Sequence, residues 1–294
     1  MGCFNSVQLL GIVTDDPILV IDDESKEVIK GSVFLTVVSP NRDNGLVKDE
    51  ELIYSNPFIF SQDPQILESM TEWKKNDIVF IKGVITTLDA KRGVKCSCCG
   101  QKSFRDSEIT LITPIFAESR FTGLTEKEAL EIITERREVS NQVYLIGRLC
   151  KDVDDKVTKG SYRALKDILH FRDIAKYQLG ISRKFFLRQD SPDNKADYPH
   201  IISVGERAVR DKTCLHKNSL VLIDGMIYTR EYRRMEICPH CNEKFDWNYK
   251  TTEILSFATE YLDDYITPEE AERAAQEKKE AKLADISKIL GTQV

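Results

Sequence analysis

Several features that mark other protein classes are missing from this chain of 294 residues. No apolar run reaches the roughly 18 residues that a membrane-spanning helix requires. The first residues do not combine a basic segment with an apolar one, so a secretory signal is not expected. The chain has only 4 His and 2 Trp, and it contains no P-loop, nucleophile-elbow or H-E-x-x-H motif. These absences favour a cytoplasmic protein that is not an enzyme and does not bind membranes.

A strong positive charge is also absent, since 42 Lys and Arg stand against 48 Asp and Glu, a net charge of −6. This average conceals two unlike halves. Residues 1–121 contain 13 Lys and Arg against 18 Asp and Glu, a net of −5, whereas residues 141–262 contain 21 against 17, a net of +4. The second half is therefore the better candidate for binding an anionic partner.

The chain contains an internal repeat of three blocks that recur in the same order. The paired blocks are residues 5–11 and 141–147, residues 79–83 and 221–225, and the C-x-x-C motifs at 96–99 and 238–241. Apolar residues alternate with polar ones in the first block of each copy, which is typical of a half-buried strand. Both copies are therefore predicted to be built mainly from β-strands.

A helix is predicted between the third and fourth strands of each copy. Residues 61–73 offer a cap, a proline in the first turn and apolar residues at helical spacing, and residues 206–216 form a less regular equivalent. Five strands with a helix in this position are typical of the OB-fold, a small Greek-key barrel. The predicted fold class is mainly β, with two tandem OB-fold barrels, a linker helix and a C-terminal helix.

Two capping boxes locate the remaining helices. Thr125 and Glu128 predict a linker helix over residues 125–137, and Thr267 and Glu270 predict a C-terminal helix of about six turns. The predicted domains are a first barrel at 1–121, the linker helix at 122–140, a second barrel at 141–262, and a C-terminal helix and tail at 263–294.

The second copy resembles the bacterial single-stranded DNA-binding protein family. The resemblance covers most of residues 141–262 and runs, in order, through residues 141–149, 177–184, 198–205, 218–230 and 249–254. It implies a non-enzymatic protein that binds single-stranded DNA without sequence preference in replication, recombination or DNA transfer. It also implies a homodimer in which two chains supply four barrels, and replication or recombination proteins as further partners.

A protein of this kind needs exposed aromatic rings on which bases stack, and basic side chains for the phosphates. The family's three stacking positions, carried onto this sequence, fall on Phe185, Tyr198 and Tyr232. Basic side chains accompany them, so the predicted DNA-binding residues also include Arg183, Lys184, Arg188, Arg230, Arg233 and Arg234. The alternative is that these aromatic residues only cover the sheet.

The first barrel lacks the same pattern. Residues 39–43 have no aromatic side chain, and Ala90 stands at the position equivalent to Tyr232. The first barrel is therefore predicted to be structural, or to bind weakly through Lys91, Arg92, Lys95, Lys102 and Arg105.

Each copy carries a C-x-x-C motif in the loop between its fourth and fifth strands. A glycine or asparagine follows each motif and tolerates the positive φ that turns two thiolates in one direction. A closed zinc site needs four ligands, so Cys96, Cys99, Cys238 and Cys241 are predicted to share one structural zinc, within one chain or across a dimer. Two alternatives stay open, namely separate sites that recruit Cys98 or His240, and free thiols or reversible disulfides. Family members ordinarily lack these motifs, so the zinc does not follow from the resemblance.

Other functions remain as alternatives. A scaffold or loading protein of a replication or conjugation complex would bind nucleic acid only as a secondary ligand. A thiol redox protein would use the C-x-x-C motifs, although the βαβ context of such motifs is absent. RNA is an alternative ligand, because stacking and phosphate contacts do not distinguish it from DNA.

Overall fold

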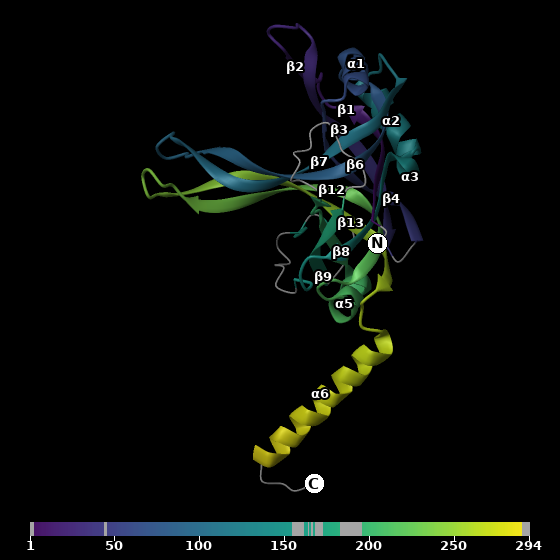
Figure 1. Cartoon of the computed structure of the whole chain (residues 1–294), viewed down its shortest axis with the longest axis vertical. Helices are drawn as coiled ribbons and strands as arrows, with labels where there is room; N and C mark the ends of the chain where they lie inside the picture. Colours follow the sequence, from purple (N-terminus) through teal and green to yellow (C-terminus); the bar gives the residue numbers. More distant parts are fainter. Residues whose placement is uncertain are drawn as a thin grey trace.

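The computed structural model describes residues 3–43, 46–154, 162, 163, 165, 167, 173–182 and 196–289. Strands dominate, and they form two similar units (Figure 1). The first unit contains β1 (Phe4–Val13), β2 (Ile18–Ile21), β3 (Val28–Asp43), β4 (Leu46–Ser55), β5 (Phe58–Ser61), α1 (Pro64–Glu72), β6 (Ile78–Lys95) and β7 (Lys102–Phe121). The second contains β8 (Asn141–Leu149), β9 (Ile174–Ser182), β10 (Ala196–Asp197), β11 (His200–Val204), α5 (Gly205–Cys214), β12 (Leu220–Ile237) and β13 (Lys244–Asp263). The helices α2 (Glu126–Glu135) and α3 (Arg137–Ser140) lie between the units in sequence, and α6 (Pro268–Ile289) follows the second.

Each unit closes into a five-stranded barrel. In the first, β1 pairs with β6, β6 with β7, β7 with β5, β5 with β3, and β3 again with β1. The second repeats this ring as β8, β12, β13, β11 and β9. In each ring one pair is parallel, β5 with β7 and β11 with β13. A closed ring with a helix between its third and fourth strands is the OB-fold, which confirms the predicted fold class.

The repeated first block forms the first strand of each barrel, and these strands join the barrels. Val7 and Leu9 of β1, and Val143 and Leu145 of β8, are fully buried, in agreement with the alternating pattern. The two strands also pair with each other antiparallel. One continuous sheet therefore runs through both barrels, and one hydrophobic cluster contains residues of both.

The asparagine that opens each repeated block has the same role in both barrels. Asn5 Nδ2 donates to the carbonyl oxygen of Ile85 at 2.8 Å, and its Oδ1 accepts from the backbone N–H of Ile85 at 2.9 Å. Asn141 makes the same two bonds to Ile227, both at 2.9 Å. Each asparagine thus satisfies both backbone groups of one residue in the fourth strand of its barrel, which explains its recurrence in the repeat.

The predicted helices are present. Asp63 caps α1 through a bond to the backbone N–H of Gln65, and the capping box of Thr125 and Glu128 starts α2. α5 occupies the equivalent position in the second barrel. Thr267 precedes α6, which extends away from the barrels in Figure 1. Among the described residues, no helix has both the length and the apolar character needed to cross a membrane.

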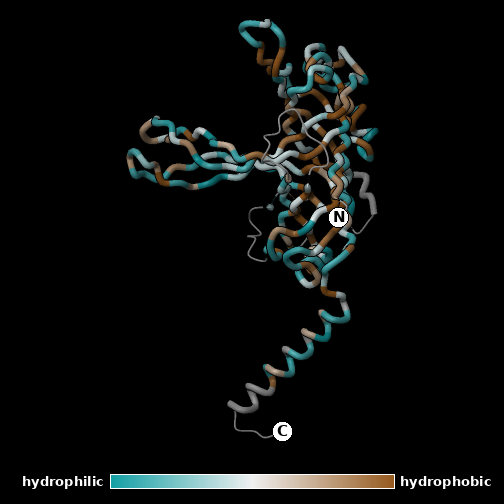
Figure 2. Tube along the Cα trace, in the orientation of Figure 1, coloured by the Kyte–Doolittle hydropathy of each residue, from teal (hydrophilic) through white to brown (hydrophobic). Residues whose placement is uncertain are grey.

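The fourth and fifth strands of each barrel continue beyond it as long hairpins. β6–β7 and β12–β13 project to the same side of the molecule, where Figure 1 draws them in blue and green. We call the projecting part, residues 88–109 and 230–251, the arm. In Figure 2 the arm is mostly hydrophilic, while the strands of the barrels contain more of the hydrophobic segments.

Candidate nucleic-acid interface and metal centre

The two hairpins of the arm pack against each other through their inner faces. Val94 and Phe245 are 2% and 4% exposed, and they form a small hydrophobic cluster with Cys96 and Cys238. Trp247 packs against this cluster. Because strand residues alternate between two faces, the same alternation leaves every second side chain of the arm directed outward. The arm therefore has a narrow core of its own and two outer faces.

Charged side chains also connect the hairpins. Arg105 Nε lies 2.6 Å from Glu236 Oε2, an ion pair between β7 and β12. Arg92 Nη1 donates to the carbonyl oxygen of Lys250 at 2.9 Å, and its guanidinium lies 4.6 Å from the centre of the Tyr249 ring. Arg92 and Arg105 were predicted as weak DNA contacts of the first barrel. The structure instead places both between the hairpins, where they hold the arm together.

The four predicted cysteine ligands meet at the end of the arm. Their sulfur atoms all lie within 4.8 Å of one another. The Sγ atoms of Cys96 and Cys241 are 3.8 Å apart, and those of Cys99 and Cys238 are 3.7 Å apart. Disulfide sulfurs are separated by about 2.05 Å, so these pairs are not bonded. A single chain thus brings all four thiols together.

The backbone of each C-x-x-C motif prepares its thiols for a metal. The N–H groups of Cys98 and His240 point at the sulfurs of Cys96 and Cys238, at 3.3 and 3.4 Å. Gly100 and Asn242 have φ of 72° and 60°, the positive values expected from the sequence.

Backbone hydrogen bonds also favour the thiolate forms of Cys96 and Cys238, whereas burial and the neighbouring thiols raise the pKa of Cys99 and Cys241. The backbone N–H of Cys99 lowers the pKa of Cys96 to about 6, and that of Cys241 lowers the pKa of Cys238. A thiolate, not a thiol, is the form that binds a metal.

These positions fit a tetrahedral metal ion. Sulfurs that surround Zn²⁺ at about 2.3 Å in a tetrahedron are about 3.8 Å apart, which matches the separations of 3.8 and 3.7 Å in the pairs Cys96–Cys241 and Cys99–Cys238. Cys98 and His240 are exposed and lie outside the group of four. The structure therefore favours one shared site over separate sites that recruit Cys98 or His240. A filled set of four cysteines leaves no open coordination position, so such a site is structural rather than catalytic.

Four of the predicted DNA-binding residues lie outside the described residues. They are Arg183, Lys184, Phe185 and Arg188. Tyr198 is described, and its side chain is 45% exposed in the loop between β10 and β11. The backbone N–H of Tyr198 donates to Thr87 Oγ1 at 2.8 Å, so this loop of the second barrel is anchored on the first barrel's hairpin.

Tyr232 and Arg230 lie on the inner face of the arm rather than its outer face. The Tyr232 ring lies 5.0 Å from that of Tyr249 and 4.6 Å from the Arg230 guanidinium. Arg230 Nε forms an ion pair with Glu253 Oε2 at 2.9 Å, and its side chain is only 11% exposed. Arg230 is thus engaged inside the protein, and only part of the Tyr232 ring is accessible.

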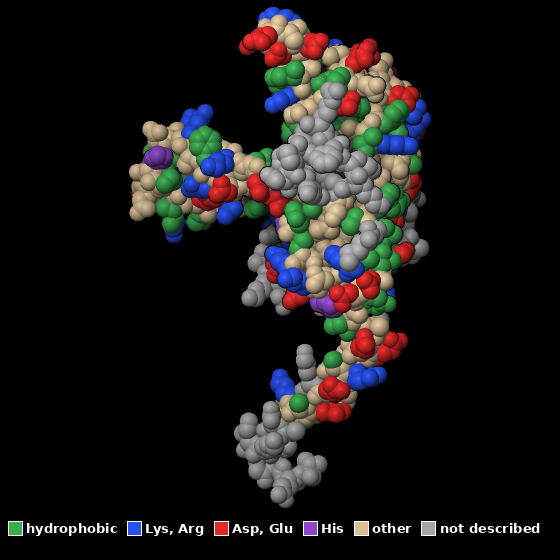
Figure 3. All heavy atoms as spheres, in the orientation of Figure 1, with side chains coloured by type: hydrophobic (Ala, Val, Ile, Leu, Met, Phe, Trp, Pro, Cys, Tyr) green, Lys and Arg blue, Asp and Glu red, His purple; other side chains and the backbone are tan. Residues whose placement is uncertain are grey.

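Arg233 and Arg234, by contrast, are exposed, although Arg234 Nε also forms an ion pair with Glu236 Oε1 at 3.3 Å. They belong to a larger set of exposed cationic side chains on the arm, which also includes Lys91, Lys95, Lys102 and Lys244. Figure 3 shows Lys and Arg side chains gathered along the arm. In total the arm contains ten Lys and Arg against seven Asp and Glu, a net of +3 in a chain of net charge −6.

Phe104, which no motif marks in the sequence, is a further candidate for stacking. It lies on the outer face of β7 and is 67% exposed. It stands opposite Gly93 in the ladder, between the exposed Lys91 and Lys95 along β6. Its signal in the sequence was the alternation of Lys102, Phe104 and Asp106 with inward residues, which becomes informative only once the direction of the inner face is known.

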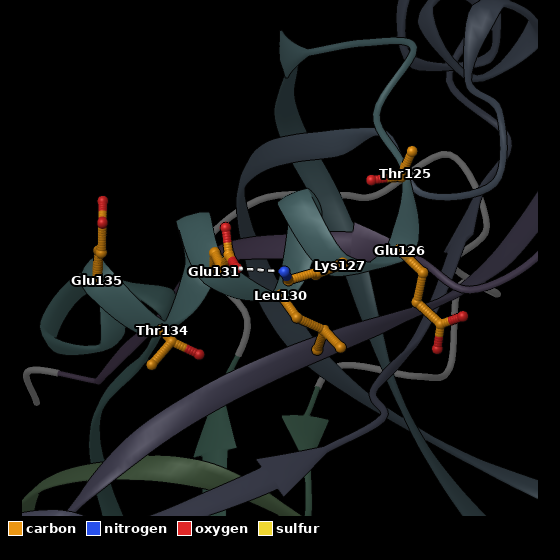
Figure 4. A pocket seen from close by; sticks show the side chains of 7 residues that line it. All are labelled: Thr125, Glu126, Lys127, Leu130, Glu131, Thr134 and Glu135. Carbon is orange, nitrogen blue, oxygen red and sulfur yellow. Dashed lines mark ion pairs between the residues drawn. The ribbon is translucent and has the colours of Figure 1, made fainter.

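A shallow groove elsewhere has the wrong charge for nucleic acid. It runs along α2 and is lined by seven residues between Thr125 and Glu135, with Lys127 Nζ 3.8 Å from Glu131 Oε1 (Figure 4). Glu126, Glu131 and Glu135 outnumber its single lysine. It therefore repels phosphate and does not extend the candidate interface.

Comparison with known proteins places this fold in context. No protein-family model matches the chain. It is 32% identical over 92 residues to "Single-stranded DNA-binding protein 3" of Clostridium acetobutylicum and to "Single-stranded DNA-binding protein" of Clostridium tetani. Each match covers 31% of this chain and little more than half of the relative, 56% and 55% respectively.

Solved structures of the same class align over longer stretches. A deletion mutant of the single-stranded DNA binding protein from Thermus aquaticus aligns over 91% of this chain and 98% of its own, at 14% identity and a TM-score of 0.49. A Plasmodium falciparum complex with single-stranded DNA covers 42% of this chain at 17% identity and a TM-score of 0.30.

The class is thus an OB-fold protein with two barrels in one chain. The sequence matches confirm the predicted resemblance: over 92 residues the chain is similar to bacterial single-stranded DNA-binding proteins.

Proposed function

We propose that this protein binds single-stranded DNA without sequence preference and is a binding protein rather than an enzyme. The observation that carries the proposal is the arm, whose outer faces present exposed cations and Phe104 although the whole chain is acidic. Cations neutralise phosphates, and exposed aromatic rings stack on bases of any sequence. The curated relatives, which are named for single-stranded DNA binding, support the same ligand.

The second barrel is proposed as the main DNA-binding domain, within the division 1–121, 122–140, 141–262 and 263–294. Arg233, Arg234 and the exposed Tyr198 support this assignment. Arg183, Lys184, Phe185 and Arg188 remain part of it as predictions from the resemblance. Homodimer formation, partner proteins of replication or recombination, and a cytoplasmic location also remain proposals from the resemblance and the sequence.

Zinc is the proposed metal at Cys96, Cys99, Cys238 and Cys241. Its role would be to cross-link two hairpins whose own core is narrow, since structural zinc contributes directly to folding free energy. Four thiolates around Zn²⁺ carry a net charge of −2. Lys95, Lys102 and Lys244 flank the motifs and offset this charge at the end of the arm. Metal analysis should find about one zinc per chain after purification without chelator, and less than about half would contradict the proposal.

Fluorescence anisotropy tests the DNA-binding function directly. The probe is a labelled oligo-dT of about 35 nucleotides, long enough for several OB-folds, titrated at two salt concentrations with an unlabelled duplex as competitor. Tight, salt-sensitive binding that the duplex does not displace is the expected result. Binding no tighter than to the duplex would favour the scaffold alternative. A matching oligo-U probe decides between DNA and RNA.

A further inference from the structure

The two barrels differ at one pair of equivalent positions near the base of the arm. In the first barrel, Phe34 of β3 stands directly opposite Phe58 of β5. In the second, the same ladder position holds Gln178 of β9 opposite His200 of β11. The equivalence is independent of sequence alignment, because Phe58 and His200 each precede the residue that makes the parallel pairing to the last barrel strand.

The hairpin of the opposite barrel completes each of these positions. Lys250 of β13 places its Nζ 4.7 Å from the centre of the Phe34 ring. The equivalent residue of the other hairpin is Glu108 of β7, whose carboxylate lies 3.3 Å from Gln178 Nε2 and 3.7 Å from His200 Nε2. One site therefore combines two aromatic rings with a cation, and the other combines two polar side chains with an acid.

The aromatic site is open to solvent. The Phe34 side chain is 42% exposed, and its ring centre lies 5.0 Å from that of Phe58. On the second barrel, by contrast, part of the corresponding sheet face is covered, since Tyr162 and Leu165 pack with Ile202 in a buried cluster. An exposed phenylalanine beside a half-buried one on the neighbouring strand, with a lysine over its ring, is unusual for a surface whose only task is solubility.

We propose that Phe34, Phe58 and Lys250 form a base-stacking site for single-stranded DNA, built from both barrels. A base stacks on the exposed phenylalanine face while the lysine ammonium moves to the adjacent phosphate. The site rests on the proposed function and extends it to the first barrel. The second barrel's equivalent is unfavourable, because Glu108 repels phosphate.

The charges around the site agree with an anionic ligand. Within the described residues, no carboxylate lies within ion-pair distance of Lys250, whereas Lys176 and Arg230 of the second barrel are both paired with Glu253. Lys250 is therefore a cation that a phosphate can engage without first breaking an ion pair. Its backbone is held by the bond from Arg92, which fixes its position over the first barrel.

The test exchanges the aromatic pair for the residues that the second barrel uses. The double variant Phe34→Gln with Phe58→His should weaken oligo-dT binding about five-fold or more, as expected for the loss of one stacked base. It should leave binding of a base-free phosphodiester oligomer unchanged. The control variant Ile115→Gln removes an apolar side chain of the same barrel that is 56% exposed, and it should bind both probes like the wild type.

Two further measurements test the stacking site even if the double variant unfolds. Lys250→Gln should reduce the slope of log affinity against log salt by about 0.7, the value for one phosphate contact on a single strand. Oligo-dT carrying 5-iododeoxyuridine should photo-cross-link to the peptide containing Phe34 or Phe58, as mapped by mass spectrometry.

The outcomes separate the site from the function. If wild-type protein fails to bind oligo-dT, the proposed function itself is wrong. If wild-type protein binds and both the double variant and Lys250→Gln bind equally well with no cross-link at either phenylalanine, only this site is overturned. The triple change Glu108→Lys, Gln178→Phe and His200→Phe would build the same site on the second barrel, and it should tighten binding.

Discussion

The two barrels share one topology and the same asparagine bonds to the fourth strand, yet they differ in the polar residues that they bury. The second barrel buries an ionic cluster in which Glu253 accepts from Lys176 Nζ at 2.6 Å and from Arg230 Nε at 2.9 Å. The first barrel has Leu111 and Leu88 at the positions equivalent to Glu253 and Arg230. An OB-fold thus tolerates either apolar or ionic side chains at these two positions. Each barrel can therefore present a different surface.

Each barrel also anchors one of its loops on the hairpin of the other barrel. A loop of the first barrel donates from the Asn56 backbone N–H to Thr229 Oγ1 at 2.8 Å, and the equivalent loop of the second donates from Tyr198 to Thr87 at the same distance. Each loop is therefore attached to the hairpin of the other barrel. Binding surfaces near the base of the arm consequently belong to both barrels.

The largest expected effect concerns the end of the arm, where both hairpins carry the same C-x-x-C motif. The double variant Cys238→Ser with Cys241→Ser should lower the zinc content from about one per chain to near zero, because two thiols do not complete a closed site. Hydrogen exchange should then increase in residues 88–109 and 230–251 while the barrels stay protected. Cys98→Ser is the matched control, and a loss of zinc in this variant would contradict the four-cysteine assignment.

Replacing Glu253 tests whether the buried ionic cluster stabilises the second barrel. Glu253→Gln should lower the free energy of unfolding by about 3–5 kcal/mol, because two buried or partly buried cations lose their shared partner. Chemical denaturation measures the loss, with exposed Glu231→Gln as the control. A loss similar to that of the control would show that the cluster is not a stabilising unit.

The same residue predicts a dependence on pH. Burial raises the pKa of Glu253, but hydrogen bonding and charge from Arg230 and Lys176 outweigh burial and hold it below its ordinary value. A depressed carboxyl pKa contributes stability above the unfolded value of about 4.3, and this contribution is lost as the pH falls through the folded value. The wild type should therefore lose more stability on acidification below about pH 5 than Glu253→Gln does.

Charge reversal on the arm tests the division of labour between the barrels. Arg233→Glu with Arg234→Glu should reduce the salt slope of oligo-dT binding by about 1.4, the value for two phosphate contacts. Lys91→Glu with Lys95→Glu is the matched change on the first hairpin and should have the smaller effect. Arg92 is unsuitable for this comparison, because it bonds to the second hairpin. Equal losses would mean that both hairpins share the DNA path.

The smallest effect is expected from replacing Asn5 or Asn141, the asparagines that bond to the fourth strand of each barrel. Asn141 is 5% exposed, whereas Asn5 is only partly buried. Asn141→Ala should therefore destabilise more than Asn5→Ala, within a range of about 1–3 kcal/mol for buried groups left without a partner. Thermal unfolding of the two single variants measures this order, and the reverse order would indicate that burial does not set the cost.

Part of the site was predictable because it depends on local patterns. The positive φ of Gly100 and Asn242 follows from the chemistry of a C-x-x-C turn, and the repeat alone paired the two motifs. Tyr232 illustrates the limit of such reasoning. The resemblance predicts it after the fourth strand, whereas the structure places it within β12, where its direction depends on which face of the hairpin meets the other hairpin. Nothing local to Tyr232 decides that.

The sequence by itself determined the period-2 strands, the capped helices, the duplication and therefore two OB-fold barrels with paired cysteine motifs. These depend on spacing and on short-range hydrogen bonds, which a sequence displays directly. Only the tertiary structure decided that the hairpins pack together, that Arg92 and Arg230 face inward, and that Lys250 lies over Phe34. The physical reason is that one sheet passes from β1 into β8 and aligns both barrels, so residues more than 200 positions apart meet.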